Sequence, residues 1–111
     1  MTKPRFVDHE AFRCLRMNDA DGFVRAVAGS KVVDFSDADL RGCDFRRADL
    51  ANVVLRGAYL RDADLRGCDL RHLDLAGCSL HSAKIGGAWF PDNIPAAEIA
   101  LSVQSGTRIR T

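Results

Sequence analysis

Three histidines and four cysteines have the widest chemical range in this 111-residue chain. Imidazole and thiolate groups bind zinc, and they also serve as general bases and nucleophiles. Zinc requires several such groups to converge at about 2.0–2.3 Å from one ion. The residues to be placed are His9, His72, His81, Cys14, Cys43, Cys68 and Cys78.

The positions of these residues argue against a shared metal site. Cys43, Cys68 and Cys78 each take a place that alanine fills elsewhere in a repeated pattern, which is typical of a small buried residue. We therefore expect reduced, structural thiols that face inward. His72 and His81 occupy variable places in the same pattern, so we expect them to face outward into solvent, and we expect His9 to be a solvated surface histidine as well.

Other catalytic patterns are also weak. Ser36, Ser79 and Ser82 have no spacing that implies a histidine–carboxylate relay, and Gly86-Gly87 alone does not form a phosphate-binding loop. The sequence predicts no enzyme, no cofactor and no metal.

Charged residues recur at fixed places. Seven aspartates are expected to hydrogen-bond to the backbone at corners, as aspartate does in turns: Asp34, Asp39, Asp44, Asp49, Asp64, Asp69 and Asp74. Six arginines follow at a fixed offset: Arg41, Arg46, Arg56, Arg61, Arg66 and Arg71. They are either a solvated face balanced by aspartate or a contact for an acidic partner, and both readings stay open.

The pattern that positions these residues has a period of five. A large apolar residue stands at each of twelve successive steps: Phe35, Leu40, Phe45, Leu50, Leu55, Leu60, Leu65, Leu70, Leu75, Leu80, Ile85 and Phe90. A second, usually small, apolar residue lies two places before each. Residues spaced five apart form no stripe along a helix, and on a straight strand they fall alternately on opposite faces. The chain must therefore bend once in every five residues, with these twelve as its core.

The exceptions among the small residues set the length of one turn. Val33, Val53 and Leu73 are larger than the alanines and cysteines at equivalent places, and they lie twenty residues apart. A turn of four five-residue sides stacks them in one column. About three turns then fit between residues 33 and 90.

The segment "FSDADLRGCDFRRADLANVVLRGAYLRDADLRGCDLRHLDLAGCSL" resembles the pentapeptide-repeat family, whose pattern is Ala-(Asp/Asn)-Leu-X-X. The resemblance covers residues 33–90. It implies a β-solenoid, specifically a right-handed quadrilateral β-helix of about three coils. Five residues depart from the family's Asp or Asn: Val54, Tyr59, Ser79, Lys84 and Trp89.

A short solenoid needs covers at both ends. Residues 1–31 are expected to form a cap of two short helices within 8–28, with Asn18 or Asp19 and Gly29 at the ends of the second. The repeat occupies 32–90. Residues 91–111 are expected to form a capping helix from Pro95 to Gly106 and a tail that pairs as a strand. Trp89 is expected to pack beneath that helix.

Composition limits the function. A net charge of +1 argues against a nucleic-acid partner, and no apolar run approaches the ~20 residues that span a bilayer. The start of the chain lacks a signal-peptide core, so a cytoplasmic location without membrane contact is expected.

We expect a non-catalytic protein–protein interaction or scaffold module with a protein partner. The expected contact residues combine an exposed tyrosine with stacked arginines: Arg41, Arg46, Tyr59, Arg61 and Arg66. One alternative, implied by the resemblance, is a DNA-mimic-like modulator of a topoisomerase such as gyrase. Another is an oligomeric scaffold, a homodimer through Ile99, Leu101 and Val103 of the C-terminal helix.

Overall fold

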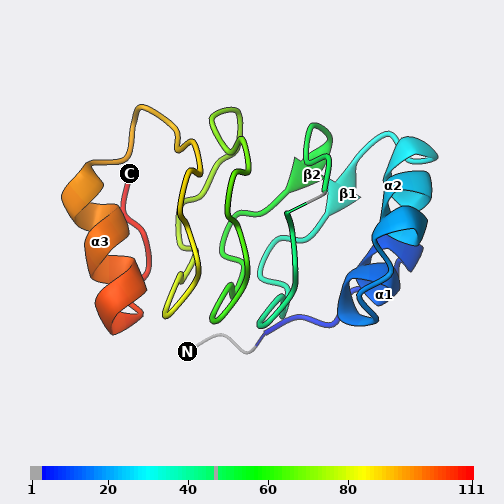
Figure 1. Ribbon diagram of the computed structural model, residues 1–111, viewed down its shortest axis with the longest axis horizontal. Coiled ribbons are helices and arrows are strands. Elements are labelled where there is room, and N and C mark those ends of the chain that lie inside the picture. The colour runs from blue at the N-terminus through cyan, green and yellow to red at the C-terminus, as the bar shows by residue number, and fades with distance from the viewer. Residues whose placement is uncertain (1–3, 47) are drawn as a thin grey trace.

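The computed structural model describes residues 4–46 and 48–111 (Figure 1). Helices α1 (Glu10–Arg16) and α2 (Ala20–Ala28) lie at one end of the molecule, and α3 (Ala96–Ser105) lies at the other. Stacked turns of the repeat region fill the space between them. None of the helices in the described residues is long and apolar enough to cross a membrane.

Successive turns of the repeat region stack in parallel, twenty residues apart. Strand β1 (Val33–Asp34) pairs with β2 (Val53–Val54), with Val33 opposite Val53. Single bridges continue at the same offset: Asp39–Tyr59, Asp44–Asp64, Tyr59–Ser79, Asp64–Lys84 and Asp69–Trp89. The predicted twenty-residue turn is confirmed. Regular strand is limited to β1 and β2 within the described residues, and the other pairings are single bridges.

A tight main-chain turn follows each large apolar residue. The amide of the next small residue donates to the carbonyl three residues earlier, as in Ala38 to Phe35 and Ala63 to Leu60, both at 3.0 Å. In most of these turns, though not at Asn52 or His72, the third residue has a positive φ in the left-handed region, which is typical of a type II turn. This conformation occurs at Asp37, Gly42, Gly57, Asp62, Gly67, Gly77, Ser82 and Gly87.

The seven corner aspartates act as predicted. Each side chain accepts a hydrogen bond from the amide two residues later, as in Asp34 with Ser36 at 2.9 Å and Asp74 with Ala76 at 3.0 Å. The same bond is present at Asp39, Asp44, Asp49, Asp64 and Asp69. Because this bond satisfies an amide that the turn leaves unpaired, aspartate fixes each bend locally.

The large residues form the interior of the coil. From Phe35 to Leu80 every one is buried, with Leu50 the most exposed at 4%. Ile85 and Phe90, in the last turn, are only partly buried. Val33, Val53 and Leu73 are all buried. The predicted core is therefore confirmed, with looser packing at its C-terminal end.

Helices α1 and α2 cover the first turn. The ring of His9 caps α1 by accepting from the amide of Ala11, and Asp19 caps α2 by accepting from that of Gly22. Phe12 meets Phe35 edge to face, with ring centroids 6.2 Å apart. Of the two residues predicted as possible caps of α2, Asn18 and Asp19, the structure uses Asp19, and the predicted end at Gly29 is confirmed.

Helix α3 and the tail cover part of the last turn. Pro95 precedes α3, and Gly106 ends it with a φ of 75°. Arg108 then pairs antiparallel with Ser79, and Ile109 is 2% exposed. The tail therefore pairs as predicted, through one bridge.

The predicted burial of Trp89 is wrong. Its side chain is 58% exposed, and the guanidinium of Arg71 lies over its ring, 4.8 Å from the centroid. The hydrogen bonds that α3 and the tail make with the last turn go to residues 77–82, which form a different side of the turn from Trp89.

Candidate functional site

Two neighbouring columns of side chains form a shallow groove along one side of the coil. Asp39, Tyr59 and Ser79 are stacked by parallel bridges. The amides of Gly42 and Asp62 bond to the carbonyls of Arg61 and His81 one turn above, at 2.8 and 2.9 Å, which aligns the second column. The groove encloses about 260 Å³ and is lined by Arg41, Tyr59, Arg61, Ser79, His81, Ser105 and Gly106.

The structure thus brings together Arg41, Tyr59 and Arg61, as the twenty-residue turn predicts. The two arginines differ in their ion pairs. Arg41 makes a two-pronged contact with Asp39, with Nε–Oδ1 at 2.7 Å and Nη2–Oδ2 at 2.8 Å. This hydrogen bond holds the pKa of Asp39 below its usual value. Arg61 has a looser contact with Asp62, 3.8 Å away, and its side chain is 59% exposed.

Tyr59 differs from the exposed residue that the sequence suggested. It is half-buried, and the guanidinium of Arg108 lies over its ring at 4.8 Å from the centroid. The Tyr59 hydroxyl also accepts a hydrogen bond of 2.6 Å from Nη2 of Arg108. The tail, by pairing with Ser79, brings Arg108 to this position. Tyr59 therefore forms the wall of the groove.

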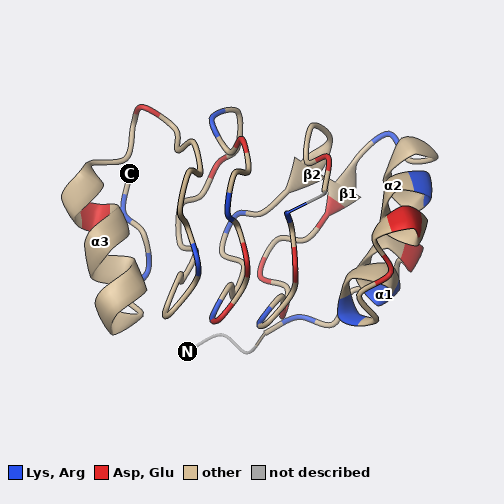
Figure 2. Ribbon diagram, in the orientation of Figure 1, with Lys and Arg blue, Asp and Glu red and all other residues tan. Residues whose placement is uncertain are grey.

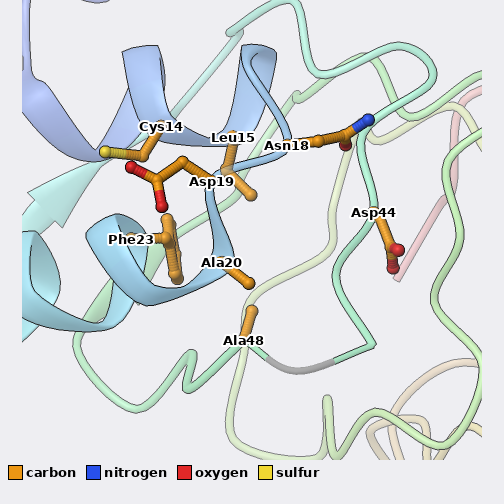
Figure 3. Close-up of a pocket in the computed structure, with 8 residues that line it drawn as sticks. All are labelled: Cys14, Leu15, Asn18, Asp19, Ala20, Phe23, Asp44 and Ala48. Carbon is orange, nitrogen blue, oxygen red and sulfur yellow. The ribbon is translucent and has the colours of Figure 1, made fainter.

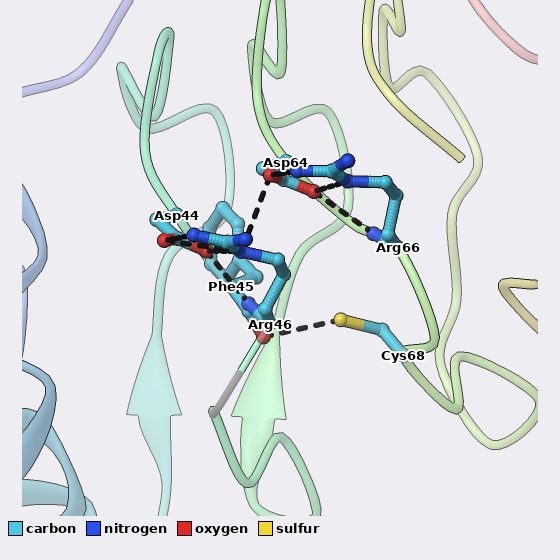
Figure 4. A network of polar contacts seen from close by, with 6 residues as sticks. All are labelled: Asp44, Phe45, Arg46, Asp64, Arg66 and Cys68. Carbon is cyan, nitrogen blue, oxygen red and sulfur yellow. Dashed lines mark hydrogen bonds and ion pairs between the residues drawn. The ribbon is translucent and has the colours of Figure 1, made fainter. Parts of the chain in front are cut away.

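Arg46 and Arg66 lie on the next side of the coil (Figure 4). Arg66 binds Asp64 through two hydrogen bonds of 2.9 and 2.7 Å, and Arg46 binds Asp44 in the same way. Nε of Arg46 also lies 3.3 Å from Oδ2 of Asp64. Carboxylates thus surround both guanidinium groups, so this side is a balanced ionic ladder. Along the repeats generally, acidic and basic residues alternate (Figure 2).

Asp64 is the central acceptor of this ladder. It is 8% exposed, and the hydrogen bond from Arg66, with further attraction from Arg46, lowers its pKa to about 2. Asp69, bound in the same way by Arg71, also has its pKa lowered to about 2. Both carboxylates are therefore ionised at neutral pH and engaged by their own arginines.

The histidines have separate structural surroundings. His72 is exposed as expected, and its Nε2 lies 3.0 Å from the carbonyl of Leu50. The prediction of solvated rings is wrong for His9, which is partly buried as the cap of α1, and for His81, which is partly buried beside Gly106. Among the described residues, no three His, Cys, Asp or Glu side chains are placed to hold a metal ion.

The cysteines are buried and form no disulfide. Cys68 donates to the carbonyl of Phe45 at 3.1 Å, and Cys78 donates to that of Leu55 at 2.9 Å, each one turn below. Burial raises the pKa of Cys68 to about 11 and that of Cys78 to about 12. Because the thiolate is the reactive form, these groups serve packing rather than nucleophilic chemistry.

A second, smaller cavity lies between the helices and the first turn (Figure 3). It measures about 60 Å³ and is lined by Cys14, Leu15, Asn18, Asp19, Ala20, Phe23, Asp44 and Ala48. Small-molecule sites usually occupy about 300–1,000 Å³. This cavity is therefore a gap between the cap and the coil, with room for a few waters.

The residues predicted to join two subunits lie on both faces of α3. Ile99 and Val103 are partly buried against the chain's own core, whereas Leu101 is 39% exposed. Leu101 is thus the member of this set that is available to a second copy. The homodimer stays a prediction.

A family model of pentapeptide repeats matches residues 34–71 and 58–92, with 8 copies of the repeat. The two matches together span a little over half of the 111 residues. The chain belongs to the pentapeptide-repeat family. A search of curated proteins found no match.

Membership explains which residues are held by the repeat itself. The aspartates of the pentapeptide pattern are occupied by turns and arginines, and its leucines by the core. Tyr59, Ser79 and Lys84 depart from the pattern, and Tyr59 and Ser79 line the groove with Arg61. The repeat pattern alone therefore does not account for the residues that line the groove at Tyr59 and Ser79.

Proposed function

We propose that this pentapeptide-repeat chain is a non-catalytic protein-interaction module. Its groove of Arg41, Tyr59, Arg61, Ser79 and His81 binds an acidic segment of a partner protein. The finer geometry we assign to the repeat is the right-handed quadrilateral β-helix that the family generally forms. In that geometry the groove is one flat side of the coil.

The observation that carries this proposal is the contrast between Arg61 and its neighbours. Arg41, Arg46 and Arg66 each make two short hydrogen bonds to an aspartate of their own pentapeptide. At the equivalent place before Arg61, Tyr59 replaces aspartate, and the nearest carboxylate oxygen is 3.8 Å away. An incoming carboxylate can therefore bind the Arg61 guanidinium in the two-pronged manner that Asp39 uses on Arg41.

The shape and charge of the groove favour a protein over other partners. At about 260 Å³, it falls short of the usual small-molecule pocket. Acidic and basic residues are interspersed along the repeats (Figure 2), which weakens attraction to a nucleic-acid backbone. The same balance differs from the continuous negative charge that mimicry of DNA would require, so the topoisomerase alternative gains no support.

Affinity capture from the native host tests this proposal. The Arg61→Glu variant should lose at least one protein that the unmodified chain retains, because a carboxylate at this place repels an acidic segment. Arg56→Glu is the matched control, since Arg56 holds the same place in its pentapeptide but pairs with Asp74 on another side. Retention of the same proteins by all three chains would reject the groove as the contact.

A further inference from the structure

The last turn of the coil is covered on one side and open on the next two. Over residues 77–82, the tail and α3 supply hydrogen bonds: Gly77 donates to Ile109, Leu80 to the Ser102 hydroxyl and Ser82 to Val103. A further turn of the coil would lie over residues 83–90, but the chain turns away from the coil after these residues and leads to α3 (Figure 1). We call residues 83–90 the terminal edge.

The terminal edge repeats a hydrogen-bonding pattern that is fully used one turn earlier. There, Leu65 donates to Lys84 at 2.8 Å and Leu70 donates to Trp89 at 2.7 Å. Lys84 in turn donates to Ala63 at 2.9 Å. The equivalent groups of the terminal edge have no hydrogen-bond partner among the described residues: the amides of Ile85, Gly87 and Phe90 and the carbonyls of Ala83 and Ala88.

The apolar residues of the terminal edge are incompletely buried. Leu65 and Leu70 are 0% and 1% exposed, whereas Ile85 and Phe90, one turn above them, are only partly buried. Trp89 is 58% exposed beside them. An added strand would therefore satisfy backbone groups and remove apolar surface from water at the same time.

The chain shows what kind of segment this end of the coil accepts. On the neighbouring side, the tail lies in an extended conformation against residues 77–79, with Ile109 donating to Cys78 at 2.9 Å. Its Ile109 side chain is 2% exposed, and Arg108 and Arg110, on either side of it, are exposed. An alternating segment, apolar inward and charged outward, thus already pairs with this turn.

The positive charge of Lys84 at the terminal edge favours a negatively charged side chain on the outward face of an added strand. Lys84 stands where the pentapeptide pattern has aspartate, is exposed, and forms no ion pair with any carboxylate that the structure describes. A strand stacked on residues 83–85 places one outward side chain directly above Lys84, as Lys84 itself lies above Asp64. Opposite charges at such cross-strand places stabilise the pair.

We propose that the terminal edge binds an extended segment of a partner protein as an added strand, with apolar residues facing inward and an acidic residue above Lys84. This surface is separate from the groove around Arg61. Main-chain hydrogen bonds supply the pairing, and the side-chain alternation supplies the selectivity, as in other cases of strand addition.

A synthetic peptide tests the proposal without knowledge of the partner. The probe is acetyl-Val-Glu-Val-Glu-Val-amide, titrated into the full chain with amide hydrogen exchange as the readout. In the free chain the amides of Ile85, Gly87 and Phe90 should exchange faster than those of Leu65, Gly67 and Leu70. With peptide, the amides of Ile85 and Gly87, which lie opposite its five residues, should slow at least tenfold.

Two controls separate strand addition from other binding. A peptide N-methylated at both glutamates lacks the amide that would donate to Ala83 and should not protect the edge. Lys84→Glu should weaken binding of the acidic peptide by about five-fold, and a Val-Lys-Val-Lys-Val peptide should then bind better than the acidic one. Lys31→Glu, a change at an exposed lysine of the opposite end, should leave the affinity unchanged.

Three outcomes would overturn the proposal. One is absence of protection at millimolar peptide, and another is equal protection by the N-methylated peptide. The third is a free chain that sediments as a dimer with these amides already protected, which would assign the edge to a second copy.

Discussion

Gly57 lies directly above Asp37, the residue that precedes it by twenty places in the chain. A Cβ atom on Gly57 would overlap the Asp37 carboxylate, and both residues have φ values in the left-handed region, 73° and 57°. Gly77 continues the column, since its own Cβ would approach the Cα of Gly57 to 3.4 Å. Turns twenty residues apart are thus stacked closely enough that residues of one column face each other directly.

Replacing Gly57 with alanine should destabilise the protein by about 1–2 kcal/mol, because the left-handed conformation opposes a side chain, whereas the overlapping carboxylate of Asp37 is exposed and can rotate away. Gly42→Ala is the matched control. Its φ is 75° and no atom lies within 4 Å of the added Cβ, so a loss of about 1–2 kcal/mol is expected there too. Urea unfolding measures both, and a loss below about 0.5 kcal/mol in either variant would contradict the left-handed turns at these glycines.

Leu65→Ala should cost about 2–5 kcal/mol, as expected when a fully buried leucine is removed from a core. Ile85→Ala should cost less, because Ile85 holds the same place one turn above and is only partly buried. Chemical unfolding of the two variants gives the comparison. A larger loss at Ile85 than at Leu65 would mean that the last turn is as well packed as the middle one.

Stability should fall as the pH drops from about 4 toward 2. Hydrogen bonds from Arg66 lower the pKa of Asp64 from 3.8 to about 2 in the folded chain. A lowered folded pKa contributes stability above the unfolded value, and that contribution is lost as the carboxylate protonates. Asp64→Asn should therefore reduce stability at neutral pH and flatten its dependence between pH 2 and 4. An unchanged pH profile in this variant would contradict the role of the ion pairs at Asp64.

The buried thiols should resist modification until the protein unfolds. Cys68 and Cys78 have pKa values raised to about 11 and 12 by burial, and Cys14 and Cys43 are also buried. A water-soluble disulfide reagent at pH 8 should label them only at the rate of unfolding. Met17→Cys, at a side chain that is 79% exposed, should add one rapidly labelled thiol. Rapid labelling of the unmodified chain would show that the coil opens locally.

Most of the coil could be predicted from the sequence because the signals that form it lie within each pentapeptide. The large residue defines the interior, the aspartate fixes the turn, and a residue able to adopt positive φ follows. Val33 and Val53 set the length of one turn, since only a twenty-residue repeat places them side by side. Local signals likewise predicted the cap at Asp19 and the stop at Gly106.

The contacts that depend on where non-repeating segments dock could not be predicted. Arg108 reaches Tyr59 only because the tail pairs with Ser79, and no periodicity encodes that register. The guanidinium of Arg5 bonds to the carbonyls of Asp34 and Ser36 for the same kind of reason. Trp89 is exposed because the cap covers a different side. The candidate groove was therefore predicted at Arg41, Tyr59 and Arg61, whereas the contact of Tyr59 with Arg108 and the end formed by Ser105 and Gly106 were not predicted.

The register of the coil is the claim on which both the groove and the terminal edge depend. Solution NMR of the backbone tests it most directly. The account predicts cross-strand contacts between Tyr59 and both Asp39 and Ser79, with slow exchange of the Tyr59 and Leu60 amides, which bond to Ala38 and Ser79 at 2.9 Å. Contacts from Leu60 that run only to residues three and four places away along the chain would contradict it.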